Sequence, residues 1–451
     1  MAGAVGFEPT VRGTKNRCLT TWLRPNGAGS YPRRRGAARW YREKIALSGV
    51  AKHPSRGGMK RVEVAILGAG AAGMMCAVEA GRRGRSVLVI DHNAAPGEKI
   101  RISGGGRCNF TNLEAPPERF LSANPRFAIS ALRRFPPSAF IARVDRAGIA
   151  WHEKTLGQLF CDGSAKQIVA MLTGQMAEAG AELWLSTAIE AVERDGDFVI
   201  QTARGPVRAA RLVLATGGKS IPKMGATGLA YRIAEQFGLG VTDTRPGLVP
   251  LTFAEQELAT LRDLPGVSVA ARVGCGRIAF EEGFLFTHRG LSGPSILQIS
   301  SYWREGLPVT VDLLPGTALG AYLRAERGMN GRVALVRTLA AVLPEKLAQN
   351  VVARAGMAPG ARLADLSNAQ ADHLAAAVHD WQVRPVGTEG YRTAEVTLGG
   401  VDTAGLSSQT MEARGCPGLF VIGEAVDVTG WLGGYNFQWA WASGWAAGQV
   451  V

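Results

Sequence analysis

Three glycines between two apolar segments are the first residues whose spacing indicates a chemical role. Gly68, Gly70 and Gly73 follow the apolar segment VEVAIL (residues 62–67) and begin a helix-like segment over residues 71–83. In such a turn the first glycine permits the tight bend, the second lets the backbone approach a pyrophosphate, and the third lets the helix pack closely on the strand. Backbone N–H groups at the helix start bind phosphate. The pattern predicts a dinucleotide-binding site.

A second strand and a carboxylate complete this pattern. The segment RSVLVI (residues 85–90) predicts a strand, and Asp91 follows it, 18 residues after Gly73. Asp91 is well placed to accept hydrogen bonds from ribose hydroxyls. We also expect Ala72, inside the glycine turn, to contact the cofactor. Because the fingerprint serves both FAD and NAD, it does not choose between them.

A second glycine cluster lies in KIRISGGGRCNFTN (residues 99–112). Three successive glycines oppose a stable helix or strand, so we expect a loop pressed against a flat or anionic ligand. The alternative is an ordinary glycine-rich surface turn. The residues predicted to contact the cofactor here are Lys99, Ser103, Gly104, Gly106, Arg107, Cys108 and Asn109.

Two residues of this cluster have further expected roles. Arg107 is a candidate catalytic residue that would stabilise negative charge on a reduced flavin. Cys108 is either a small buried filler, which we favour, or a redox-active thiol.

Two later strands also end in glycine. The segment RLVLATGG (residues 211–218) follows a hairpin-like stretch and ends in Thr216, Gly217 and Gly218, which favours a flavoprotein of the glutathione-reductase-like type. The segment GLFVIGE (residues 418–424) predicts a strand before a helix over residues 437–448. The cofactor contacts expected around this strand are Gly423, Glu424, Asp427, Gly433, Gly434, Tyr435 and Asn436.

The geometry expected of these last residues follows from their position. Asp427 is a candidate partner for a ribityl hydroxyl or the flavin-side phosphate, and the helix start would direct N–H groups at the flavin O2/N1 edge. Phe437, Trp441 and Trp445 recur at helical spacing and are predicted to pack in the core rather than to form a substrate cage.

Together these motifs resemble one family of bacterial flavoproteins, related to aminoacetone oxidase and to the flavoprotein reductase of bile-acid dehydroxylation. The resemblance runs from about Lys60 to the end and includes LATGGKSIPKMGATG (residues 214–228), FTHRGLSGPSILQIS (286–300) and EVTLGGV (395–401). It implies non-covalent FAD, a redox reaction and a Rossmann-like flavin domain split by an insertion. One departure is that Leu229 and Ala230 stand where the family has an acid-glycine pair.

The predicted fold class is α/β, with a glutathione-reductase-like FAD-binding domain split by an inserted β-domain plus a helical subdomain. We expect residues 1–58 to be a disordered, non-native leader, with Met59 as the natural start. The predicted parts are the FAD-binding domain at 59–245, the insertion at 246–392 and the returning part at 393–451. Within the insertion, a β-part covers 246–313 and a helical part 314–392. Its expected strands are 248–251, 267–273, 277–286, 295–299 and 308–313, and its helical breaks are Pro344, 359–360 and Ser367.

Composition limits the function classes. The net charge is +14, but residues 1–58 carry +10 of it, so the rest of the chain gives little reason to expect nucleic acid as a partner. Six scattered cysteines without a CxxC pair favour a reducing cytoplasmic compartment. There is no apolar run long enough to span a membrane, no metal-ligand cluster, and no hydrolase or NTPase motif.

His288, in FTHRG, is the second candidate catalytic residue, as a general base or substrate ligand; a structural histidine is the alternative. The substrate is expected between the flavin domain and the insertion.

The sequence thus predicts an FAD-dependent oxidoreductase. Hydride would pass between the flavin and a small amine or enone, with oxygen or transient NAD(P)H as the other redox partner. A single complete GxGxxG leans towards an oxidase. The alternatives are a flavin-dependent RNA-associated or tRNA-modifying protein and a redox-inactive flavin scaffold. The oligomeric state stays open.

Overall fold

A computed structural model describes residues 58–451 of the 451-residue chain. The predicted basic leader, residues 1–58, lies outside the described residues except for Gly58. None of the helices in the described range combines the length and apolar character needed to cross a bilayer.

The central sheet consists of parallel strands with an antiparallel hairpin at one side. Its order is β7-β2-β1-β10-β9-β8, and β20 also pairs with β10. The strands are β1 (Lys60–Leu67), β2 (Val87–Ile90), β7 (Glu182–Trp184), β8 (Ile189–Asp195), β9 (Asp197–Thr202), β10 (Val207–Leu214) and β20 (Leu419–Val421). The predicted strands at 62–67 and 85–90 are confirmed as β1 and β2.

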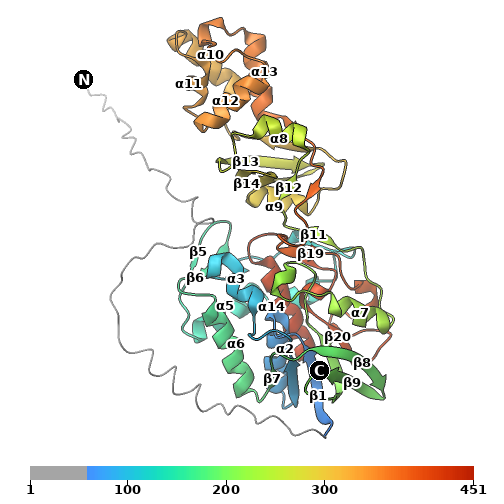
Figure 1. Ribbon diagram of the computed structural model, residues 1–451. Helices are drawn as coiled ribbons and strands as arrows, with labels where there is room; N and C mark the ends of the chain where they lie inside the picture. Colours follow the sequence, from blue (N-terminus) through green and yellow to red (C-terminus); the bar gives the residue numbers. More distant parts are fainter. Residues whose placement is uncertain (1–57) are drawn as a thin grey trace, which may run out of the picture. The chain divides into compact units, whose positions relative to one another are not determined.

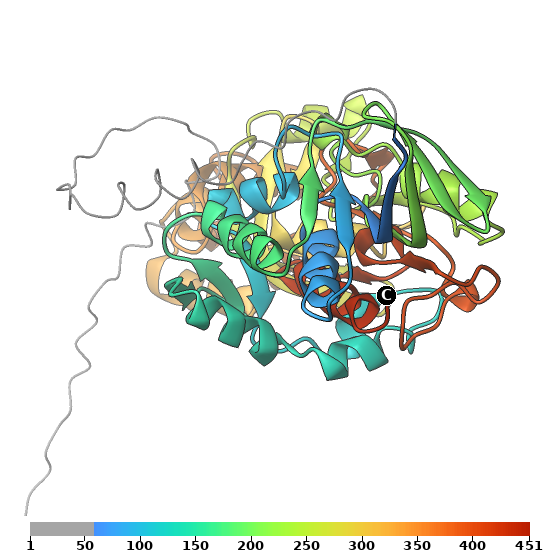
Figure 2. The ribbon, with the colours of Figure 1, turned by 90° about the horizontal axis from the view of Figure 1, so that it is seen from below.

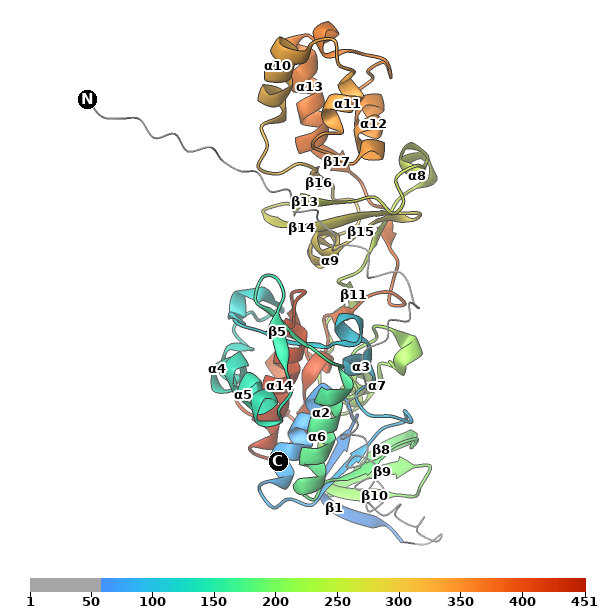
Figure 3. The same cartoon turned by 90° about the vertical axis from the view of Figure 1, so that its left-hand side faces the viewer.

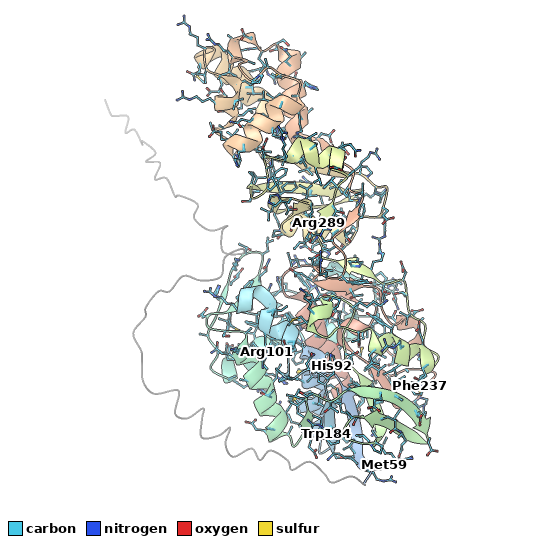
Figure 4. All side chains as sticks on the ribbon, in the orientation of Figure 1. Met59, His92, Arg101, Trp184, Phe237 and Arg289 are labelled. Atoms are coloured by element: carbon cyan, nitrogen blue, oxygen red, sulfur yellow. The ribbon has the colours of Figure 1, made fainter. Side chains whose placement is uncertain are left out.

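Four of the parallel strands end at one level. Leu67 pairs with both Ile90 and Leu214, and Leu214 pairs with Val421. Figure 4 shows Met59, directly before β1, and His92, just after β2, at opposite ends of the sheet. Ligands of open α/β sheets bind outside the carboxyl ends of the strands, so this edge is the expected site.

Two helices far apart in the sequence pack together over this sheet. They are α2 (Ala71–Gly81) and α14 (Tyr435–Gly448), which lie side by side in Figures 1 and 2. Glycines permit the contact: a Cβ on Gly444 would lie 2.5 Å from the Ala72 carbonyl oxygen. Trp441 is fully buried and stacks on Phe140 at 4.2 Å, which confirms the predicted core role of this part of the helix.

The rest of this domain consists of short elements that the sequence analysis did not anticipate. A small sheet contains β3 (Asn109–Asn112), β5 (Trp151–Glu153) and β6 (Gln158–Cys161), and β4 (Phe120–Leu121) pairs with β21 (Thr429–Gly430). The helices are α3 (Glu98–Gly106), α4 (Ile129–Arg134), α5 (Pro137–Arg146), α6 (Lys166–Glu178) and α7 (Leu229–Gln236).

A second hydrophobic core occupies residues 251–383, inside the predicted insertion. Its sheet has the order β17-β16-β13-β14-β15-β12-β18. The strands are β12 (Leu251–Thr252), β13 (Ser268–Cys275), β14 (Ile278–Thr287), β15 (Gly290–Ser292), β16 (Val309–Asp312), β17 (Trp381–Val383) and β18 (Gly387–Thr388). A separate pair, β11 (Arg245–Gly247) and β19 (Val396–Leu398), lies where the chain leaves and re-enters the flavin domain.

The helical part of this region agrees with the predicted breaks. Its helices, grouped together in Figure 3, are α10 (Leu319–Asn330), α11 (Leu335–Leu339), α12 (Glu345–Arg354) and α13 (Asn368–His379), while α8 (Glu255–Leu261) follows β12. Pro344 directly precedes α12, and the Ser367 hydroxyl caps α13 by accepting the Gln370 N–H. Proline and serine are typical of these boundary positions.

Two predicted strands were wrong. Residues 295–299 form helix α9 (Pro294–Ser300), because Pro294 suits a first helical turn and Ile296 and Ile299, three apart, are both fully buried. Of residues 248–251, only Leu251 is in a strand. The Leu248 backbone is left-handed, and the Val249 N–H donates to the Ser300 hydroxyl rather than to a neighbouring strand.

The contact between α2 and α14 predicts that Gly444→Ala is destabilising. The new methyl group would overlap the Ala72 carbonyl oxygen, so the helices must move apart, and we expect a loss of about 1–3 kcal/mol in urea unfolding. Gly174→Ala in α6 is the matched control, since a Cβ there meets nothing within 4 Å; we expect it to gain up to about 1 kcal/mol. Equal effects of the two changes would contradict this account of the packing.

Candidate functional site

The glycine turn after β1 has the features of a phosphate cradle. Gly68 is left-handed, and a Cβ on it would lie 2.4 Å from the Ala215 carbonyl oxygen. A Cβ on Gly73 would lie 2.0 Å from the Gly68 carbonyl oxygen, whereas one on Gly70 would meet nothing within 4 Å. Packing therefore requires glycine at two positions, and at Gly70 the backbone faces open space at the start of α2. This is the arrangement that a pyrophosphate needs.

Asp91 holds this turn in place. One carboxylate oxygen accepts the Ala69 N–H at 2.7 Å, and the other accepts the Asn93 N–H at 2.8 Å. The carboxylate thus connects the end of β2 to the glycine turn. Its predicted contact with ribose hydroxyls stays a prediction.

The second glycine cluster is only partly the loop that the sequence predicted. The backbone is helical from Glu98 through Lys99 to Ile102, because Glu98 in the first turn favours the positive helix end. The chain then leaves the helix at Ser103, and Gly104 and Gly105 are left-handed. The glycines thus interrupt the helix, as predicted, and their contact with a ligand stays a prediction.

Glu424 connects three segments of this edge. One of its carboxylate oxygens lies 2.6 Å from the Lys99 ammonium, while the other accepts the Ser220 hydroxyl at 2.8 Å and the Thr397 N–H at 3.0 Å. Burial opposes ionisation of Glu424. The charge of Lys99 and the hydrogen bonds from Lys99, Ser220 and Thr397 outweigh this effect and hold the Glu424 pKa below its ordinary value. The carboxylate is therefore a charged anchor at neutral pH.

The turn after β10 packs closely on this anchor. A Cβ on Gly217 would lie 3.4 Å from a Glu424 oxygen, and one on Gly218 would lie 2.5 Å from the Thr397 hydroxyl. The Thr216 hydroxyl accepts the Ala230 N–H at the start of α7. The unusual Leu229-Ala230 pair thus begins a helix beside the site without supplying an acid.

The start of α14 is the second part of the site. Gly434 is left-handed, and a Cβ there would lie 2.4 Å from the Thr111 carbonyl group. With the side-chain amide of Asn109 oriented to donate to the Thr111 and Leu159 carbonyls, its oxygen accepts the Gly434 N–H at 3.2 Å. Asn436 closes the preceding loop through two 2.8 Å hydrogen bonds with the backbone of Gly430.

Three other predicted residues surround this helix start. Gly433 is left-handed and packs against Gln158. Asp427 is buried, which raises its pKa, and it accepts the Ala123 N–H at 2.9 Å. The Tyr435 hydroxyl accepts a hydrogen bond from Arg119. The structure brings these residues together, but it leaves their contacts with a flavin as predictions.

The same loop contacts the inserted region. The Leu432 N–H donates to the Gln298 side-chain oxygen at 3.0 Å, and the Trp431 indole N–H donates to the Tyr302 hydroxyl at 2.6 Å. Trp431 packs against both hydrophobic cores. Gln298 and Tyr302 belong to the inserted region, so the helix start lies beside the boundary where we expect substrate.

The candidate catalytic residues have different surroundings. Arg107 is exposed, and its guanidinium has no hydrogen-bonding partner within residues 58–451. Cys108 is buried, which raises its thiol pKa far above the ordinary value and favours the filler interpretation. His288 is exposed in the turn between β14 and β15, in a hollow with Glu255 and Arg262 that none of the predicted cofactor residues lines. Its catalytic role stays a prediction.

Sequence reasoning missed two members of the site. Thr397 and Ser220 complete the Glu424 network, yet they lie in motifs that were noted only for their family resemblance. The available signal was Thr397, which stands two residues before the paired glycines Gly399 and Gly400. Within the described part of the chain, no group of three or more His, Cys, Asp or Glu side chains is placed to hold a metal ion.

Comparison with known proteins agrees with this geometry. Residues 62–450 match the family described as "HI0933-like protein Rossmann domain". The chain belongs to this family. It is 51% identical over 393 residues to the "Ribosomal RNA dihydrouridine synthase" of Escherichia coli (strain K12), covering 87% of this chain and 98% of the relative.

Two other relatives also align over nearly their whole length. The protein of the same name from Haemophilus influenzae is 45% identical, covering 86% of this chain and 97% of the relative. The "3-dehydro-bile acid delta(4,6)-reductase" of Clostridium scindens is 28% identical, covering 86% and 98%.

The family and the cradle together confirm the predicted α/β Rossmann-like fold and an FAD-binding flavoprotein of the oxidoreductase class. The residues fit this cofactor: the turn at Gly70 would hold the pyrophosphate, and the start of α14 would face the flavin. When bound, the flavin supplies hydride transfer. A role for NAD(P)H stays a prediction.

The cradle predicts different effects of two neighbouring substitutions. Gly70→Ala places a methyl group in open space on extended backbone, so unfolding of the flavin-free protein should be unchanged while FAD affinity falls at least about tenfold, a loss of about 1.4 kcal/mol. Gly73→Ala collides with the Gly68 carbonyl and should lower stability as well. Flavin fluorescence titration and urea unfolding measure the two effects. Normal FAD affinity in Gly70→Ala would contradict the cradle.

The Glu424 network predicts a pH-dependent stability. A carboxylate whose pKa is lower in the folded than in the unfolded protein stabilises the fold at pH values above the unfolded pKa. This stabilisation is lost as the pH falls through the folded pKa. Glu424→Gln should therefore cost about 1–3 kcal/mol at neutral pH and progressively less in acid. Exposed Glu235→Gln is the control, expected within about 0.5 kcal/mol of wild type. A pH-independent cost for Glu424→Gln would disprove the charged anchor.

Proposed function

We propose that this protein is an FAD-dependent reductase that converts a uridine of ribosomal RNA into dihydrouridine, with NAD(P)H as the reductant. The observation that carries the proposal is the 51% identity to the Escherichia coli relative over 98% of its length. The proposal favours the RNA-modifying alternative of the sequence analysis over a free small molecule as substrate.

The chemistry suits the predicted class of acceptor. In uracil the C5=C6 double bond is conjugated with the C4 carbonyl group, so the ring is an enone-type acceptor. The name of the Clostridium scindens relative also describes reduction of double bonds, in a 3-dehydro steroid acid. Reduction of a double bond conjugated with a carbonyl group would be common to both cases, and this direction supports a reductase rather than an oxidase.

The polypeptide would bind and orient the reactants. The turn after β1 and the start of α14 would hold the two ends of the cofactor, while Glu424 fixes the segments between them. Exposed Arg107, next to the glycine cluster, could stabilise negative charge on the flavin or accept an RNA phosphate. A base inside folded RNA is reached by taking it out of its stack, so the target uracil would enter the boundary beside Trp431 as an extruded base.

The test is the direct conversion of uridine to dihydrouridine in ribosomal RNA. The full chain, loaded with FAD, is incubated with NADPH and ribosomal RNA from an Escherichia coli strain that lacks the 51%-identical relative. We expect dihydrouridine, measured by mass spectrometry of the digested RNA, in an amount that requires both NADPH and the flavin. Gly70→Val, which fills the cradle, is the matched negative control.

Two results would contradict the proposal. One is unmodified RNA despite rapid oxidation of NADPH by the holoenzyme. The other is peroxide release with a primary amine and no reaction with RNA, which would support the oxidase alternative instead.

A further inference from the structure

The loop that leads into α14 is paired with a short turn from the first third of the chain. Strands β21 and β4 are antiparallel, with Gly430 opposite Phe120, and the Trp431 N–H extends their ladder by donating to the Arg119 carbonyl oxygen at 3.0 Å. Arg119 is the last residue of the 3₁₀ turn η1 (Pro117–Arg119). These backbone contacts hold Arg119 directly beside the loop before α14.

The Arg119 guanidinium lies against two aromatic rings at the start of this helix. Its central carbon is 5.4 Å from the centre of the Tyr435 ring and 5.7 Å from that of Trp431. It also donates a hydrogen bond to the hydroxyl of Tyr435, the buried first residue of α14. Contacts between a cation and aromatic rings are attractive and offset part of the cost of removing the charge from water. The guanidinium is therefore held in place at the helix start.

Trp431 places this cation at the boundary with the inserted region. Its indole packs edge-on against Phe280 of β14, with 4.8 Å between the ring centres, in addition to its hydrogen bond with Tyr302. Phe280 and Tyr302 both belong to the insertion, whereas Arg119 belongs to the flavin domain. Arg119 thus borders both the helix start that would face the flavin and the boundary where we expect the substrate.

The Arg119 side chain has hydrogen-bond donors that the protein leaves free. A guanidinium carries about five N–H donors, and the Tyr435 hydroxyl is the only acceptor that Arg119 engages among residues 58–451. Within the same range, no carboxylate lies at ion-pair distance from it, whereas the buried Arg143 is paired with Glu79 at 2.6 Å. Because Arg119 is only partly buried, its remaining N–H groups are available to an oxygen atom of a ligand.

The carboxyl groups nearest to Tyr435 leave the charge of Arg119 uncompensated. They are Glu114, which is exposed, and Glu282 on β14. Burial raises the pKa of Glu282, and its carboxyl accepts a hydrogen bond from the Gln298 amide at 3.2 Å. The side of the boundary beside Trp431 therefore carries a positive charge.

We propose that Arg119 binds the carbonyl oxygen of a conjugated substrate and stabilises the negative charge that reduction places on it. The inference rests on the proposed function, in which this oxygen is O4 of uracil. A hydride from NADPH, with its two electrons, forms the C–H bond at C6; the C5=C6 π bond breaks, and its electron pair moves towards C5 and O4. An Arg119 N–H group donates to O4 while it carries this charge. A proton from water then forms the C–H bond at C5, so NADPH is oxidised and uracil is reduced.

A carbonyl oxygen suits this position better than an RNA phosphate. Arg119 is partly buried against two rings, where a hydrogen bond from a cation is stronger than in water. A donor that is already oriented stabilises charge that develops during the reaction. Trp431 and Tyr435 are positioning residues, because they hold the guanidinium. Arg107 is exposed and stays the candidate for an RNA phosphate.

The test measures the two half-reactions separately in the FAD-loaded full chain. Stopped-flow absorbance follows flavin reduction by NADPH without RNA, and then anaerobic reoxidation at saturating ribosomal RNA. For Arg119→Ala we expect an unchanged rate of reduction, because this step places no charge on a substrate carbonyl. We expect the rate of reoxidation to fall by about 10²–10³-fold, the usual effect of removing one donor to a developing oxyanion. Arg126→Ala, at an exposed position after β4, is the matched control and should reoxidise at the wild-type rate.

Two further measurements separate a chemical role from a structural one. Guanidinium chloride, at a concentration too low to unfold the protein, should restore part of the reoxidation rate of Arg119→Ala, because the free ion replaces the missing group. Tyr435→Phe keeps the ring but removes the hydroxyl acceptor, so reoxidation alone should slow, and by less than in Arg119→Ala. The flavin spectrum and melting temperature show whether each variant has folded, and Arg119→Gln takes the place of Arg119→Ala if the alanine variant does not fold.

The outcomes distinguish the two proposals. Cyclohex-2-enone, a small conjugated carbonyl compound, is tested as a second oxidant of the reduced flavin. Wild-type reduced flavin that ribosomal RNA does not reoxidise would overturn the proposed function; Arg119 is then judged with the enone, and reoxidation by neither would overturn both proposals. Equal reoxidation rates of wild type and Arg119→Ala would overturn the role of Arg119 alone. So would a loss of RNA affinity at an unchanged maximal rate, which identifies a phosphate contact.

Discussion

The Glu424 carboxylate is the interaction on which the site depends. It joins α3 through Lys99, the turn after β10 through Ser220, and β19 through Thr397. These segments come from the first third, the middle and the end of the chain, and the central sheet alone would not hold them together. Burying this charge is favourable only because each oxygen is paired. The anchor therefore fixes these three segments relative to one another.

Close backbone contacts provide the second constraint. At Gly68, Gly73, Gly434 and Gly444 a side chain would overlap a neighbouring carbonyl group, so strand ends and helices approach more closely than other residues allow. Gly70 differs, because its missing side chain leaves space rather than contact. The glycines of this edge thus fall into two groups: those that permit close packing, and Gly70, which leaves space where the pyrophosphate is predicted to bind.

Local signals explain what could be predicted from the sequence. The strand, glycine turn, helix and carboxylate between residues 62 and 91 follow one another directly, so each strengthens the interpretation of the next. The run at 295–299 was misassigned because a short apolar segment fits either a strand or a helix, and Pro294 was the signal that should have decided.

Long-range pairing explains what could not be predicted. The Lys99–Glu424 contact joins residues 325 positions apart, and no local pattern encodes it. The same is true of β19, whose partner strand β11 lies about 150 positions earlier, on the far side of the insertion. The domain limits and the individual cofactor contacts remain predictions, although the second core falls within the expected insertion.

The two hydrogen bonds of Asp91 bear on how tightly a dinucleotide would bind. Because both hydrogen bonds are made within the protein, they restrain the glycine turn independently of what it binds. Little conformational entropy is then lost on association, and more of the gross interaction energy remains as affinity. Such pre-organisation suits a prosthetic group that stays bound through many turnovers.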